Sequence, residues 1–258
     1  MEPKKMKLSG HTLKKIINTP LNAIGFELVR KASGAGMATW IERLKLAKKL
    51  GFSPRVIVDG GAFTGGWSRD VSRIFSGAHI VTVEPNPYVQ DDIRRNISHI
   101  QPTPIVLNVA LGESPGKASL NIWRDVTTDT GASLLTHVTG RANKAIEVEV
   151  DTLDSIARQT NLMPDFVKLD LQGAELASLK GATQVLKHAE LMMIEFGCLE
   201  AYEGRTTPRD LLELMYENDY CLYDIVDCHY RPYDGALTGG DFIFVKNSSD
   251  LRKHKGWD

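Results

Sequence analysis

The sequence predicts an α/β fold, in which helices cover both faces of a mostly parallel sheet. Short apolar runs rich in β-branched residues alternate with helical stretches from residue 54 onward. These runs are apolar on both faces of the strand, as in parallel sheets that are covered on both sides. The length of 258 residues and the hydrophobic content of 42% also suffice to bury a core without disulfide bonds.

The first 50 residues differ from the rest of the chain in charge. Residues 1–50 carry eleven Lys and Arg and three acids, whereas the remainder carries 20 basic and 29 acidic residues. Thr39 and Glu42 have the spacing of a capping box, and Gly51 can end the helix that follows. We interpret residues 1–50 as an N-terminal helical extension that packs on an acidic domain at 51–258. The alternative is attraction of this basic segment to an anionic lipid surface or to nucleic acid.

From Pro54 onward, apolar runs predict the strands of the sheet, and the stretches between them predict its helices. The predicted strands cover residues 56–58, 80–83, 105–109, 166–169, 191–194, 221–226 and 241–245. The predicted helices cover residues 66–75, 88–98, 173–187 and 208–218. Two further extended stretches, 118–123 and 145–150, interrupt the alternation. They predict either an inserted strand pair or extra length at an edge of the sheet.

The strongest local signal for function is the glycine-rich turn after the first predicted strand. Asp59 ends this strand, and the turn that follows contains Gly60, Gly61 and Gly65. Glycine lets the backbone approach a ligand closely and adopt positive φ. Open α/β sheets bind ligands at the carboxyl ends of their strands, so the turn predicts a ligand site. An ordinary turn between a strand and a helix is the simpler alternative.

A second carboxylate, Glu84, ends the next predicted strand and precedes Pro85. A carboxylate at this place can accept both hydroxyls of a ribose, and helix capping is its alternative role. Both features fit a nicotinamide dinucleotide and S-adenosylmethionine alike. However, the glycines lack the G-x-G-x-x-G spacing that holds a pyrophosphate, and Asp59 would repel one. The favoured cofactor is therefore S-adenosylmethionine, with its positive sulfonium and ammonium groups. An NAD(P)-dependent oxidoreductase is the alternative function.

Two more carboxylates are expected at neighbouring strand ends, because Asp170 follows strand 166–169 and Glu195 follows strand 191–194. With these motifs, the chain resembles the FkbM family of S-adenosylmethionine-dependent methyltransferases over about residues 55–246. The resemblance rests on the order and spacing of Val58-Asp59-Gly60-Gly61-Ala62, Glu84-Pro85, Asn108-Val109-Ala110-Leu111-Gly112, Ser133-Leu134, Val150-Asp151-Thr152-Leu153-Asp154, Lys168-Leu169-Asp170-Leu171-Gln172-Gly173-Ala174-Glu175 and Asp241-Phe242-Ile243-Phe244-Val245.

The resemblance implies a Rossmann-like class I methyltransferase fold, with a seven-stranded sheet whose last strand is antiparallel. It implies an O-methyltransferase acting on a hydroxyl of a small molecule, such as a sugar, a polyketide or another secondary metabolite. The cofactor-binding residues that it implies are Asp59, Gly60, Gly61, Ala62, Gly65, Glu84, Pro85, Asn108, Ala110, Leu111 and Asp170. Three residues depart from the usual family pattern: Gly60 replaces an apolar residue, Phe63 an Asn, and Gln172 a frequent Glu.

Methyl transfer to a hydroxyl is helped by a base that takes the acceptor's proton. Asp170 is the first candidate, and capping of the following helix is its alternative role. Glu195 is the second candidate, and it could instead orient the substrate or pair with a buried donor. His229 is the third, in a polar loop expected between the last two strands, although a loop histidine is more often only solvated. His137 is a weaker candidate in the 127–141 loop, which could act as a lid.

The remaining expectations concern metals, partners and location. Asp170, Glu195 and Asp241 could form an oxygen-rich Mg²⁺ site, but no local spacing supports one, and we predict no metal. Asp170 is followed by Leu-Gln-Gly rather than Pro-Pro-aromatic, and the main domain is acidic, so no nucleic-acid partner is predicted. The sequence shows neither a membrane-spanning stretch nor a signal peptide, and three cysteines without a C-x-x-C pair predict no disulfide framework. We expect a cytoplasmic protein without integral membrane association, and a homodimer is compatible with the sequence.

Overall fold

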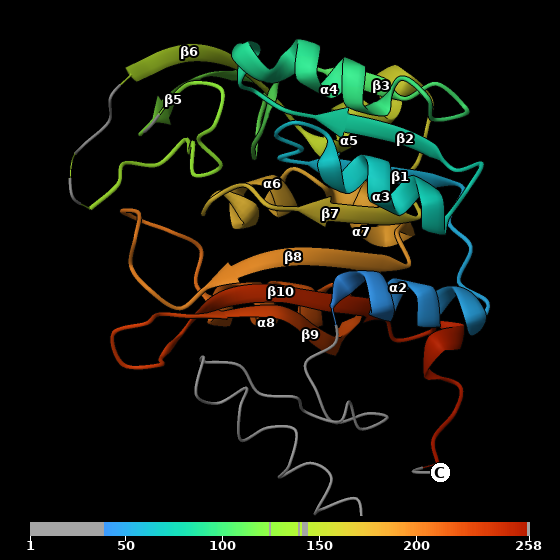
Figure 1. Ribbon diagram of the computed structural model, residues 1–258. Helices are drawn as coiled ribbons and strands as arrows, with labels where there is room; N and C mark the ends of the chain where they lie inside the picture. The colour runs from blue at the N-terminus through green and yellow to red at the C-terminus, as the bar shows by residue number, and fades with distance from the viewer. Residues whose placement is uncertain (1–38, 124, 139, 141–143, 257–258) are drawn as a thin grey trace, which may run out of the picture. The chain divides into compact units, whose positions relative to one another are not determined.

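Seven strands make up the central sheet. They are β1 (Val56–Gly60), β2 (His79–Val83), β3 (Ile105–Leu107), β7 (Phe166–Leu169), β8 (Leu191–Gly197), β9 (Tyr220–Tyr230) and β10 (Leu237–Lys246). The computed structural model describes residues 39–123, 125–138, 140 and 144–256, and it orders these strands β3-β2-β1-β7-β8-β10-β9 (Figure 1). All neighbouring pairs are parallel except those of β10, which runs antiparallel to β8 and β9. The predicted topology is confirmed.

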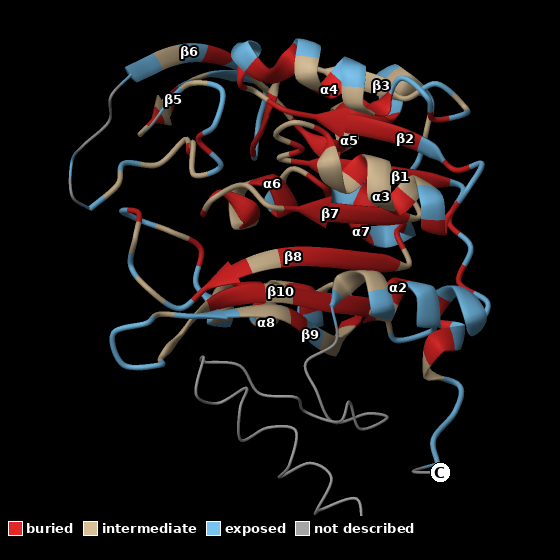
Figure 2. Ribbon diagram, in the orientation of Figure 1, coloured by how far each residue is buried: buried red, intermediate tan, exposed pale blue. Residues whose placement is uncertain are grey.

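Helices cover both faces of this sheet, as predicted. The first face carries α2 (Trp40–Lys49), α3 (Gly66–Ile74) and α4 (Gln90–Ile97), the last preceded by the 3-10 turn η1 (Pro87–Val89). The second face carries α5 (Leu153–Thr160), α6 (Glu175–Lys180), α7 (Thr183–His188) and α8 (Pro208–Glu217). Successive strand residues point to opposite faces, so Ile57 joins the first core and Val58 the second. The central strands β1, β7, β8 and β10 are largely buried between the two layers (Figure 2), whereas the edge strands β3 and β9 are only partly buried.

A second, smaller sheet follows β3. It contains β4 (Ala110–Leu111), β5 (Gly116–Ile122) and β6 (Lys144–Asp151) in the order β4-β6-β5, with β5 and β6 antiparallel. The predicted strand pair at 118–123 and 145–150 is therefore confirmed, and the alternative of extra length on the main sheet is wrong. Strand β4 is the first element of this insertion, and it begins three residues after the end of β3.

Several elements differ from the sequence prediction. The helix expected over 173–187 is split into α6 and α7 at Gly181, which is the C-cap of α6 and packs so closely that a Cβ would lie 2.4 Å from the carbonyl oxygen of Gly112. Helix α5 was not predicted, although Thr152 caps it by accepting from Ser155 N. The last two strands also extend beyond their predicted ends. His229 consequently lies in β9 and not in a loop.

Helix α2 belongs to the same compact unit as the sheet, which runs from Met37 to Asp258. Its capping box between Thr39 and Glu42 is confirmed, and Leu44 and Ala47 are buried in the core of the first face. Residues 1–38 of the expected N-terminal extension lie outside the described residues. Among the described residues, no helix has the length and apolar character needed to cross a membrane.

Candidate functional site

A cavity of about 280 Å³ lies at the carboxyl ends of the central strands. Its walls come from the turn after β1, the ends of β2 and β7, strand β4 and the loop at 129–134. Seven of the sequence-predicted cofactor residues line it, namely Gly61, Ala62, Glu84, Pro85, Ala110, Leu111 and Asp170. The other four, Asp59, Gly60, Gly65 and Asn108, do not. The structure therefore brings most of the predicted set to one concave surface.

The turn after β1 is packed against the end of β7. Gly61 has a φ of +72°, and a Cβ at this position would lie 1.9 Å from the carbonyl oxygen of Asp170. The amides of Gly61 and Ala62 both donate to the carbonyl oxygen of Val83, at 2.9 and 3.1 Å. Only glycine combines this φ with so close an approach of two backbones. The turn thus forms a cavity wall of backbone without a bulky side chain.

Asp59 lies behind this wall and not in it. Its side chain is completely buried, and Oδ2 accepts a 2.6 Å hydrogen bond from Ser68 Oγ. Lys168 Nζ lies 3.2 Å from Asp59 Oδ1 and 3.6 Å from Asp170 Oδ2, and it donates to the Gly61 carbonyl oxygen at 3.0 Å. Burial by itself lowers the pKa of Lys168, but the carboxylates of Asp59 and Asp170 outweigh it, and the pKa is raised. A charged lysine therefore links the buried Asp59 to the cavity.

Glu84 lines the cavity with a carboxylate that is already held in place. Its Oε2 accepts from Phe63 N at 2.7 Å, and its Oε1 accepts from Asn86 N at 2.9 Å. Burial raises the pKa of Glu84 to about 7, against the lowering effect of these two amides. Asn108 supports the same segment from outside the cavity, because its side-chain amide donates to the carbonyl oxygens of Glu84 and Pro85.

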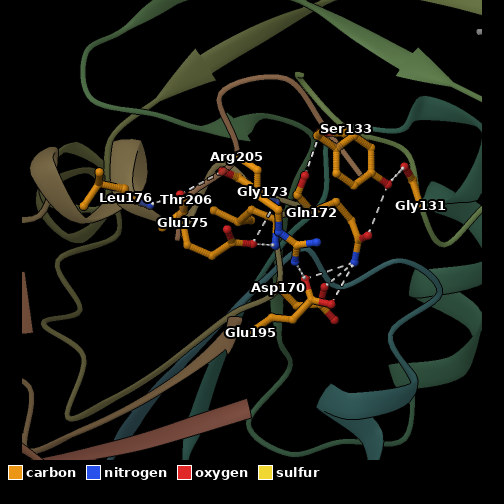
Figure 3. A network of polar contacts seen from close by, with 12 residues as sticks. Gly131, Ser133, Asp170, Gln172, Gly173, Glu175, Leu176, Glu195, Arg205 and Thr206 are labelled. Atoms are coloured by element: carbon orange, nitrogen blue, oxygen red, sulfur yellow. Dashed lines mark hydrogen bonds and ion pairs between the residues drawn. The ribbon is translucent and has the colours of Figure 1, made fainter. Parts of the chain in front are cut away.

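The two candidate bases are neighbours joined by a third side chain (Figure 3). The amide nitrogen of Gln172 donates to Asp170 Oδ1 at 2.9 Å and lies 3.2 Å from Glu195 Oε2. Asp170 is 38% exposed and faces the cavity, whereas Glu195 lies outside the cavity lining, with Arg205 Nη2 3.9 Å away. Burial first, and then the charges of Asp170 and Glu175, raise the pKa of Glu195 well above its usual range.

The alternative role of Asp170 as a helix cap is not observed, because α6 has no side-chain cap. Glu175 instead accepts from the amides of Leu171 and Gly173 and is buried.

His229 is not among the residues that line the cavity. The described residues contain no group of three or more His, Cys, Asp or Glu side chains arranged to hold a metal ion.

Several lining residues were not singled out as site residues by the sequence. Lys168 carried a usable signal, since it is the one charged residue in the apolar strand Phe-Val-Lys-Leu. Trp67 and Leu120 carried none, because an apolar residue at such positions usually belongs to a core. The loop residues Asp129 and Leu134 also line the cavity. They lie far along the chain from the strand ends, and only the fold brings them there.

One family of known proteins matches the sequence over most of the chain. The family model described as the methyltransferase FkbM domain matches residues 59–223. Curated protein sequences give no significant match.

Solved structures that resemble the chain include an O-methyltransferase from Bacillus cereus, with 16% identity, coverage of 94% of each chain and a TM-score of 0.42. Fibrillarin from Aeropyrum pernix has 13% identity, coverage of 79% of this chain and 73% of its own, and a TM-score of 0.46. Magnesium protoporphyrin IX methyltransferase from Synechocystis has 11% identity, coverage of 95% and 100%, and a TM-score of 0.42.

Proposed function

The chain belongs to the FkbM family of S-adenosylmethionine-dependent methyltransferases, and we propose that it transfers the methyl group to a hydroxyl of a small molecule. The acceptor class that we propose is a sugar, a polyketide or another secondary metabolite. The alternative of an NAD(P)-dependent oxidoreductase is not supported by this family membership. A cytoplasmic location and the absence of a metal remain parts of the proposal, whereas the division of the chain at residue 50 is a prediction that the stability of a shortened chain can test.

The charge of the cavity supports the cofactor assignment. Among the described lining residues, Glu84, Asp129 and Asp170 are acidic, and Lys168 is the one lysine or arginine. The charge of Lys168 is matched by Asp59, which lies behind the wall, and by Asp170. The cavity therefore presents an acidic balance, which favours a cationic ligand over a pyrophosphate. This balance is the observation that carries the cofactor assignment, and the partly exposed carboxylate of Asp170 in the cavity wall is the one that carries transfer to a hydroxyl.

The residues present fit S-adenosylmethionine part by part. We propose that the amino-acid end of the cofactor lies against the glycine turn at Gly61 and Ala62, that Glu84 binds the ribose hydroxyls, and that Ala110 and Leu111 contact the adenine. When bound, the cofactor supplies a methyl carbon on a positively charged sulfur, which is an activated leaving group. The protein then mainly has to align the acceptor and receive its proton.

Asp170 is the residue that we assign as the base, because its carboxylate is partly exposed in the cavity wall. Glu195 is buried beside it and is connected to it through Gln172, so we assign it a secondary role in holding the acceptor or the proton. His229 remains the third candidate of the sequence analysis, although it does not line the cavity.

Calorimetric titration of the full chain with S-adenosylhomocysteine and with NADH tests the cofactor. We expect binding of S-adenosylhomocysteine only, and binding of NADH only would contradict the proposal.

The acceptor is tested by incubation with methyl-labelled S-adenosylmethionine and a panel of sugars, phenols, amines and RNA. Label in a hydroxyl-bearing small molecule supports O-methylation, whereas label only in an amine or in RNA refutes it. With an identified acceptor, Asp170→Asn should lose more activity than Glu195→Gln.

A further inference from the structure

Gln172 has an unusual backbone conformation at the edge of the cavity. Five described residues other than glycine have positive φ, and three of them are Asn or Asp, which tolerate it. The other two, Phe63 and Gln172, both line the cavity. Gln172 has a φ of +53°, which a glycine would adopt without strain. Strained positions of this kind are kept where the surroundings hold them, often at functional sites. The strained backbone at Gln172 therefore indicates that its side chain has a role at this site.

The side chain of Gln172 lies between two carboxylates. Its amide nitrogen has two hydrogens, and its acceptors are Asp170 Oδ1 at 2.9 Å and the oxygens of Glu195 at 3.2 and 3.4 Å. Its amide oxygen lies 3.4 Å from the hydroxyl of Tyr202, and its carbonyl oxygen accepts from Ser133 Oγ at 2.8 Å (Figure 3). The amide nitrogen and the main-chain carbonyl of Gln172 are thus held, whereas the Tyr202 hydroxyl makes its shorter hydrogen bond, of 2.8 Å, to the carbonyl oxygen of Gly131.

These contacts fix the Asp170 carboxylate from two sides. The ammonium group of Lys168 lies 3.6 Å from Asp170 Oδ2, and the amide nitrogen of Gln172 donates to Asp170 Oδ1. A neutral amide can satisfy two acids without adding charge to a cluster that already contains Glu175, Glu195 and Asp241, with Arg205 as its other cation. A carboxylate in its place would add to the repulsion, and an apolar side chain would provide no donor.

We propose that Gln172 is a positioning residue, which holds the carboxylate of Asp170 toward the methyl group to be transferred. The inference rests on the proposed function of Asp170 and adds the residue through which that function is maintained. Gln172 acts through Asp170, so its removal should matter only while Asp170 keeps its charge. A role in stability alone would not depend on Asp170 in this way.

The experiment compares the affinities of the full chain for S-adenosylmethionine, which carries the sulfonium charge, and for S-adenosylhomocysteine, which does not. Calorimetry at about pH 7.5 gives both dissociation constants, and thermal unfolding shows that each variant is folded. The variants are Gln172→Met, which removes the amide at nearly constant size, and Gln172→Gly, which suits the positive φ and keeps the test available if the first is unstable. Gln184→Met, at an exposed position on α7, is the matched control.

Both substitutions at Gln172 should lower the preference for S-adenosylmethionine over S-adenosylhomocysteine by roughly three- to tenfold, because each would weaken one interaction between a carboxylate and the sulfonium. In an Asp170→Asn background the same substitutions should have no further effect. The inference is overturned if either folded variant keeps the unaltered chain's preference for S-adenosylmethionine over S-adenosylhomocysteine. It is also overturned if the substitutions lower this preference as much in the Asp170→Asn background as in the unaltered chain. Failure of the unaltered chain to bind either compound overturns the proposed function instead.

Discussion

Lys168 is the charged residue on which the interior of the site depends. Its ammonium group lies 3.2 Å from the completely buried Asp59. Lys168→Met would leave that carboxylate without its cation, and removal of one partner of a buried pair destabilises a protein by about 3–5 kcal/mol. We expect a loss of this size in urea unfolding. Lys187→Met, on the exposed side of α7, should change stability little.

A second substitution separates this explanation from a simple loss of packing. Asp59→Asn combined with Lys168→Met removes both charges, so the double variant should be more stable than Lys168→Met alone. A double variant that is less stable than either single variant would contradict the role of the ion pair.

Asp241 makes the stability of the protein depend on pH. Burial first, and then the charge of Asp170, raise the pKa of Asp241 from 3.8 to about 7. The folded chain therefore holds this proton more tightly than the unfolded chain does. The resulting stability is fully present below about pH 4 and is lost as the pH rises through about 7. Asp241→Asn should be more stable than the unaltered chain at about pH 8, by roughly 2–4 kcal/mol, with little difference at about pH 4.

Urea unfolding at these two pH values measures the difference. Asp91→Asn, at a fully exposed position on α4, provides the control and should not change the pH dependence. If Asp241→Asn were no more stable than the unaltered chain at the higher pH, the carboxyl of Asp241 would not be held protonated in the folded state.

Among the elements, the insertion between β3 and β7 contributes to the cavity through its loop. Asp129, Thr130, Ala132 and Leu134 line the cavity, and the following segment pairs with the loop after β8, where Val138 N donates to the carbonyl oxygen of Ala201 at 3.0 Å. The insertion is thus hydrogen-bonded to the main domain beyond the residues that line the cavity.

A ligand in the cavity should therefore protect this loop. We expect S-adenosylhomocysteine to slow amide hydrogen exchange severalfold over residues 129–134, because these residues would contact it. Residues 116–119 of β5, away from the cavity, serve as the internal control and should exchange unchanged. Mass spectrometry of proteolytic peptides measures both. Protection spread equally over both segments would indicate a general stabilisation and not a contact.

For the whole molecule, α2 raises the question of where the domain begins. The charge pattern of the sequence predicts a division at residue 50, but Leu44 and Ala47 share a core with Ile57 and Phe166. A chain that begins at Met37 keeps these contacts, and a chain that begins at Gly51 loses them. We expect the shorter chain to be less stable by at least about 3 kcal/mol in urea unfolding, because the buried face of α2 is removed. Equal stabilities would support the division at residue 50.

The sequence by itself determined the order of the strands and of most helices, the acid after each central strand and the glycine turn, because local periodicity and backbone preference specify these features. The spacing of the glycines and the acid at Asp59 favoured the cofactor, and the resemblance to a family supported it and implied the antiparallel last strand. Only the tertiary structure decided which side chains meet. Asp59 turns away from the cavity to pair with Lys168, and Gln172 joins Asp170 to Glu195. The loop at 129–134 becomes a cavity wall. Such contacts join residues distant in sequence, and they depend on strand order, burial and charge balance in the folded chain.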